Sequence, residues 1–175
     1  AFMAGLGCGS YYFGYIIDHE WHENGSKDKK SSTALLIYGW IEILLFLICS
    51  IVSLVLFEFS YIYLWLSSFV PESIAAQNAV KSLLAFSLVF IPASLMGATL
   101  PILSKYFITD DSKLGRQVGI LYGVNTLGAA FGCLLAGFFL IATFGVLQTV
   151  LSAALLNLFI GVCAIRIYQE SEGTS

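Results

Sequence analysis

One acidic side chain, Glu42, lies in the middle of an apolar run, YGWIEILL. A carboxylate at such a position costs roughly 2.5–3.5 kcal/mol on membrane-insertion scales, so we expect it to face other helices and to have a partner. Two roles fit it. Glu42 would be the counter-ion or proton carrier for a small cationic substrate, with Asn125, Thr126 and Thr99 as further substrate-binding residues. Alternatively, it pins helices together through a hydrogen bond to one of those three residues.

The other polar motifs do not predict catalysis. The run HEWHE, from His19 to Glu23, differs from HExxH because its histidines are three positions apart, and nothing else completes a metal site. The cysteines form no CxxC pair. The run GLGCGS from Gly5 lacks the third glycine of a dinucleotide loop and follows no predicted strand. We therefore predict no catalytic residue, no metal and no cofactor in this chain.

The composition is that of a membrane protein. Of the 175 residues, 58% are hydrophobic and 11% are charged. Soluble domains carry roughly 25% charged residues. The net charge of −3 and the absence of a basic run argue against nucleic acid as a partner. The lipid bilayer is the partner that the composition predicts.

Five apolar segments organise the chain. They predict a transmembrane helical domain over residues 1–168, followed by a polar tail at 169–175, with spans at about 1–17, 33–57, 83–108, 118–142 and 147–167. The last four each suffice for a hydrocarbon core of ~30 Å, which needs ~20 residues. The first is short, so we expect a piece of a longer protein whose first helix is incomplete here. The predicted fold class is an all-α, polytopic transmembrane helix bundle.

The basic residues predict the orientation. If the loops at 18–32 and 105–117 and the C-terminus are cytoplasmic, seven of the eight Lys and Arg residues lie inside, and only Lys81 lies in the second loop. That second loop also holds Tyr61, Tyr63 and Trp65, which suit the outer interface. Asp18 would either bind the cytoplasmic Arg116 as a conformational latch or remain solvated.

Two prolines, Pro92 and Pro101, lie inside the third span and predict a kinked helix. Each removes a backbone donor, and in a membrane the freed carbonyl must find a neighbouring helix, a hydroxyl side chain or water. Thr99 is a candidate local donor, and the segment at 125–126 is a candidate neighbour.

Small residues recur at helical spacing in two spans. Gly5 and Gly9 form a GxxxG pair whose face Ser10 continues, and Gly128 and Gly132 form a second pair in the fourth span. Such residues let helix backbones approach closely, so we predict helix packing at all four glycines. A substrate groove lined by glycine backbone is the alternative.

Four stretches carry a resemblance to a known family. They are Phe2–Asp18, Tyr38–Leu45, Pro92–Phe107 and Leu114–Phe138. Their order resembles the membrane domain of fused spermidine synthase-like proteins, which is major-facilitator-like. The first stretch is also similar to the loop motif of major facilitator transporters, although His19 stands where that motif has Arg.

The resemblance implies that the chain is part of a six-helix repeat and that its first span is the second helix of that repeat. It implies an inner-membrane protein with a soluble C-terminal domain, beyond these residues, that transfers an aminopropyl group to putrescine. This membrane part would anchor the enzyme or handle a polyamine. A fragment of a secondary transporter with further spans, or a structural membrane subunit, remains an alternative. No catalytic residue of the family is carried over, because none of its catalytic motifs occurs here.

Overall fold

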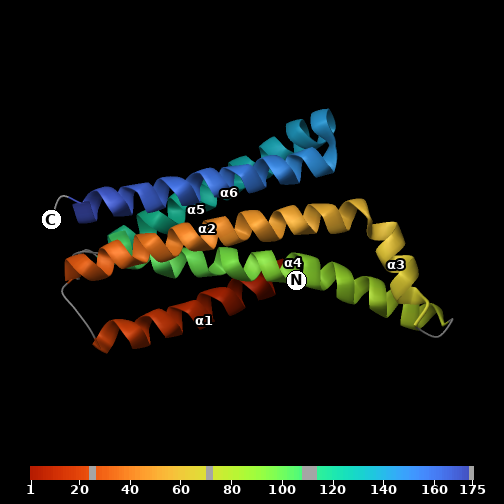
Figure 1. Cartoon of the computed structure of the whole chain (residues 1–175), viewed down its shortest axis with the longest axis horizontal. Helices are drawn as coiled ribbons and strands as arrows, with labels where there is room; N and C mark the ends of the chain where they lie inside the picture. Colours follow the sequence, from red (N-terminus) through yellow and green to blue (C-terminus); the bar gives the residue numbers. More distant parts are fainter. Residues whose placement is uncertain (24–26, 70–72, 108–113, 174–175) are drawn as a thin grey trace.

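The chain is described by a computed structural model that covers residues 1–23, 27–69, 73–107 and 114–173 (Figure 1). Nearly all of these residues are helical, and none of them lies in a strand. The elements in chain order are α1 (Phe2–Glu23), α2 (Lys27–Phe57), α3 (Phe59–Ser67), α4 (Ile74–Phe107), α5 (Leu114–Leu135), the π-helical turn η2 (Ala136–Leu140) and α6 (Ile141–Gly173). The predicted all-α fold is confirmed.

Three helices are long and apolar enough to cross a membrane. Their apolar stretches are Thr33–Phe57, Ile74–Phe107 and Gly115–Ser171. Little of this surface is covered by protein, since the most apolar window of the third stretch has no buried residue. Backbone hydrogen bonding within a helix is what allows such a surface to lie in hydrocarbon.

The third stretch is a helical hairpin rather than one rod. Gly145 has φ 82° and ψ 172°, which breaks the helix, and Figure 1 shows the chain reversing its direction between α5 and the long part of α6. That backbone conformation is open essentially to glycine alone. The break at Gly145 falls between the predicted spans at 118–142 and 147–167.

The helices pair out of sequence order. α2 packs along both α6 and α4, and α1 packs along α4. The contacts of Gly5 with Ala93 and of Gly14 with Pro101 show that α1 and α4 run parallel. α5 has few contacts with the other helices, and the side chains from 124 to 135 are all exposed.

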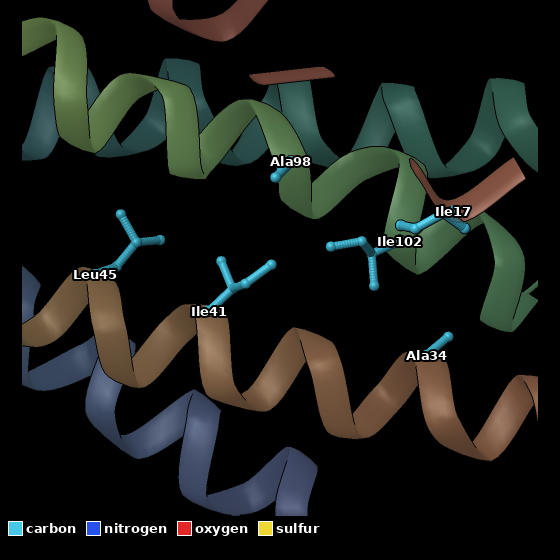
Figure 2. Close-up of a cluster of buried hydrophobic side chains, with 6 residues drawn as sticks. All are labelled: Ile17, Ala34, Ile41, Leu45, Ala98 and Ile102. Atoms are coloured by element: carbon cyan, nitrogen blue, oxygen red, sulfur yellow. The ribbon is translucent and has the colours of Figure 1, made fainter. Parts of the chain in front are cut away.

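A small core joins α1, α2 and α4. Its buried members are Ile17 from α1, Ala34, Ile41 and Leu45 from α2, and Ala98 and Ile102 from α4. Figure 2 shows the side chains of α2 and α4 pointing toward one another across the space between these helices. Ile41 and Leu45, which belong to this core, flank Glu42 on α2 and therefore hold that part of the helix in place.

The helices extend beyond the predicted spans. α1 continues to Glu23 and α2 begins at Lys27, so most of the predicted first loop at 18–32 is helical. α3 and the first turns of α4 occupy much of the predicted second loop, and α6 continues through the predicted tail to Gly173. Polar residues beyond an apolar stretch do not end a helix, because their side chains can be solvated while the backbone remains helical.

Candidate functional site

Glu42 is the one acidic or basic side chain that is buried among the described residues, with 6% of its surface exposed. It lies where α2 crosses α6. A Cβ built on Gly161 of α6 would be 2.8 Å from the carbonyl oxygen of Gly39 and 3.1 Å from Cβ of Glu42. Glycines at both positions therefore bring the two backbones together directly beside the carboxylate.

The hydrogen-bond partner of Glu42 lies on the same helix. The hydroxyl of Tyr38, one turn earlier, donates to the Glu42 carboxylate. Tyr38 also packs against the core that α1, α2 and α4 share. A carboxylate with a phenolic donor and a close helix crossing is held in place, and both groups gain a partner away from water.

The other three predicted substrate-binding residues lie elsewhere. Asn125 and Thr126 are exposed, and Thr99 is half-buried on α4. The Thr99 hydroxyl donates to the carbonyl of Met96, and the Thr126 hydroxyl donates to the carbonyl of Tyr122, each within its own helix. The four predicted residues therefore do not form one polar site.

The remaining buried polar side chains also serve their own helices. Ser53 donates to the carbonyl of Cys49 at 2.9 Å, and Thr149 donates to the carbonyl of Gly145 at 2.7 Å. Three grooves of about 400, 320 and 280 Å³ lie between described helices, and Glu42 lines none of them. Their walls are almost entirely apolar, as in the groove formed by Phe57, Val146 and Val150. Such grooves fit acyl chains or apolar side chains better than a polyamine.

Gly5 and Gly9 lie against α4. A Cβ on Gly5 would be 2.8 Å from Cβ of Ala93 and 2.8 Å from the carbonyl oxygen of Phe90. A Cβ on Gly9 would collide with the backbone of Ser94, and one on Gly97 would collide with the backbone of Leu6. The crossing of α1 and α4 thus has almost no side-chain volume between its backbones.

Both prolines lie within α4, which continues as helix from Ile74 to Phe107. Pro101 has no N–H for the carbonyl of Gly97, four residues earlier. The hydroxyl of Ser10 donates to that carbonyl across the crossing, at 2.7 Å. Ser10 therefore supplies the donor that Pro101 lacks. Thr99, the predicted local donor, serves Met96 instead.

Gly128 and Gly132 have no neighbouring helix within the described part of the chain. A Cβ built on either glycine would meet nothing within 4 Å. The GxxxG spacing is the same as in α1, so spacing alone does not distinguish a glycine pair that faces a helix of this chain from one that does not.

Most of the side chains in the possible metal site at 19–23 and in the Asp18 latch are not among those that the structure describes. His19 is exposed, whereas the side chains of Asp18, His22 and Glu23 are outside the described residues. Among the residues that were described, no three of His, Cys, Asp and Glu lie together as metal ligands would.

Sequence reasoning missed three residues of these crossings. Tyr38 is four positions before Glu42, which is the spacing of helix neighbours, so it was visible as a partner. Gly39 and Gly161 are single glycines without a repeat, and nothing in the sequence pairs them. Ser10 was part of the predicted face, but its partner depends on which helix lies opposite.

Comparison with known proteins assigns no family. No protein-family model, no curated protein and no solved structure matches the chain.

Proposed function

We propose that the chain is the membrane domain of a spermidine synthase-like protein, and that it anchors the enzyme rather than carrying a cation. The resemblance in four sequence stretches supports the family. The burial of Glu42 at the Gly39–Gly161 crossing, with Tyr38 as its donor, supports anchoring. A cation site needs several convergent ligands, and Asn125 and Thr126 are exposed on another helix.

We propose further that α1, α2, α4 and both arms of the hairpin each cross the bilayer, as in part of a major-facilitator-like repeat. At ~1.5 Å per residue, the 22 residues of α1 span about 33 Å. The hairpin arms, 114–144 and 146–173, span about 46 and 42 Å by the same rise. Each length exceeds a hydrocarbon core of ~30 Å. The distribution of Lys and Arg supports cytoplasmic loops at 18–32 and 105–117 in an inner membrane.

The test of the cation role uses vesicles that contain the full-length protein. Uptake of radiolabelled putrescine and spermidine is measured for the wild type, for Glu42→Gln, and for Glu58→Gln as a control at an exposed carboxyl group. We expect uptake equal to that of empty vesicles for all three proteins. Uptake that requires Glu42 and not Glu58 would favour the transporter and refute anchoring.

The enzyme part of the proposal has a separate test. We expect full-length protein in isolated membranes to transfer an aminopropyl group from decarboxylated S-adenosylmethionine to putrescine, with equal rates for the wild type and Glu42→Gln. Membranes that contain folded full-length protein and show no transfer would refute the spermidine synthase assignment. A structural membrane subunit would then be the remaining candidate.

A further inference from the structure

The short helix α3 lies across one end of the bundle. It joins the end of α2 to the start of α4, and Figure 1 shows it running steeply across the direction of those two long helices. A helix in this orientation is not an extension of α2 or of α4. α3 lies at the end of two apolar helices, which is where a membrane surface would be.

The length of α2 sets the depth of α3. The apolar stretch Thr33–Phe57 has 25 residues and therefore a length of about 37 Å at ~1.5 Å per residue. That exceeds the ~30 Å of hydrocarbon, so an α2 that crosses the bilayer would bring Phe57 to the boundary between acyl chains and headgroups. α3 begins two positions later, at Phe59. The charged residue Glu58 immediately precedes α3, and Lys81 of α4 lies against the Tyr63 ring of α3.

The outward face of α3 is aromatic and carries no charge. Tyr61, Leu64 and Trp65 are 74, 64 and 66% exposed, at the spacing of one helix face, and Phe69, in the turn that follows α3, is 71% exposed. The rings of Trp65 and Phe69 are 5.2 Å apart in an edge-to-face pair. Tyr and Trp combine an apolar ring with a polar donor, which favours the headgroup boundary over both water and hydrocarbon.

The inward face of α3 is tied to α4. The ammonium group of Lys81 lies 4.6 Å from the centre of the Tyr63 ring, a cation–π contact between the two helices. At the end of α3, the hydroxyls of Ser67 and Ser68 donate to the carbonyls of Leu64 and Trp65. The Trp65 carbonyl gains a donor in this way, whereas the Leu64 carbonyl also accepts the backbone N–H of Ser68. These two carbonyls at the end of α3 therefore have donors within the protein and do not require water.

We propose that α3 is an interfacial helix whose outward face binds the phospholipid headgroup layer of the bilayer and fixes the depth of α2 and α4. The rings of Tyr61 and Trp65 lie among the glycerol and carbonyl groups of the lipids, and Leu64 and Phe69 contact the upper acyl chains. The surface is continuous with the lipid-facing sides of α2 and α4. This inference stands whether or not an enzyme is attached to the chain.

Tryptophan fluorescence tests the depth directly. The chain has three tryptophans, so Trp21→Phe with Trp40→Phe leaves Trp65 as the sole emitter. The variant is placed in phosphatidylcholine vesicles brominated either near the headgroup or deep in the acyl chains. We expect stronger quenching by the shallow bromine, and a depth about 15 Å from the bilayer centre, half of a ~30 Å core.

Trp40 supplies a matched control. It is 60% exposed on α2, and it lies five positions, or about 8 Å at ~1.5 Å per residue, from the middle of the apolar stretch. The variant with Trp21→Phe and Trp65→Phe should therefore show relatively more quenching by the deep bromine. Helical circular dichroism checks the fold, and wild type against Trp65→Phe alone gives the Trp65 signal by difference.

Three results would overturn the proposal. Quenching of Trp65 by aqueous iodide with no effect of brominated lipid would place α3 in water. Protection from both iodide and lipid would show that protein covers the face, either a second copy of the chain or another segment. Equal shallow and deep quenching profiles for Trp65 and Trp40 would also contradict an interfacial position.

Discussion

Replacing Ser10 by Ala should weaken the crossing of α1 and α4, and the size of the effect should depend on Pro101. The Ser10 hydroxyl is 2.7 Å from the carbonyl oxygen of Gly97 in a half-buried setting, which is an ideal length for an O–H···O bond. Hydrogen bonds between membrane helices contribute about 0.6 kcal/mol on average and up to about 1.7 kcal/mol. Because Pro101 provides no N–H, the carbonyl loses its donor, and we expect a loss in the upper part of that range.

The companion variant is Pro101→Ala. The new alanine restores the N–H that bonds the Gly97 carbonyl within α4, so Ser10 becomes a second donor to an oxygen that already has one. In this background we expect Ser10→Ala to lower the free energy of unfolding by less than about 0.5 kcal/mol, the usual scale of a change at a site without special contacts. The double-mutant cycle cancels the effect of losing the proline ring near Gly14.

The assay is reversible unfolding in mixed detergent and dodecyl sulfate micelles, followed by circular dichroism. Ser87→Ala is the matched control, because the exposed Ser87 hydroxyl donates to the Leu83 carbonyl within α4 alone. Its effect should be within about 0.5 kcal/mol of zero with either residue at position 101. An equal cost of Ser10→Ala in both backgrounds would refute the idea that Ser10 replaces the missing donor of Pro101.

Four further outcomes are expected from the same unfolding assay. Gly9→Ala should destabilise the protein by about 1–3 kcal/mol, because the new Cβ collides with the backbone of Ser94. Gly128→Ala should instead be neutral or stabilising by up to about 1 kcal/mol. A large loss of stability at Gly128 would show that a helix outside the described chain packs there. Gly145→Ala should cost about 1–3 kcal/mol, since φ 82° with ψ 172° strains any side chain, and an unchanged midpoint would mean that the hairpin does not need this backbone conformation. Tyr38→Phe should cost about 1 kcal/mol by removing the donor to Glu42, and no loss would show that the carboxylate does not depend on this donor.

The helical character of the chain was predictable because hydrocarbon leaves the backbone few alternatives. The long apolar stretches that contain Glu42 and Pro101 were accordingly identified as helices from hydropathy alone. The prediction was less accurate for helix ends, since hydropathy reports the boundary of the hydrocarbon. A helix extends past the end of its apolar stretch, as α1 does to Glu23.

Helix pairing was not predictable in the same way. An apolar helix looks similar on all sides, so the sequence does not say that α2 lies against α6 or that α1 lies against α4. Gly39 and Gly161 gain their importance only from lying opposite one another. The predicted substrate site was inaccurate for the same reason. Asn125 and Thr126 are polar and lie in an apolar span, but the position of α5 decides whether they meet Glu42.

If α1 and α4 both cross the bilayer, as we propose, their parallel pairing has a consequence for the order in which the chain enters the membrane. Ser10 and Gly97 are 87 positions apart, and at a synthesis rate of about 5–20 residues per second the second partner follows the first by roughly 4–17 s. During that interval α1 is complete, but the backbone that fits against Gly5 and Gly9 does not yet exist. The glycine face of α1 must therefore be shielded by lipid or by the insertion machinery until α4 arrives.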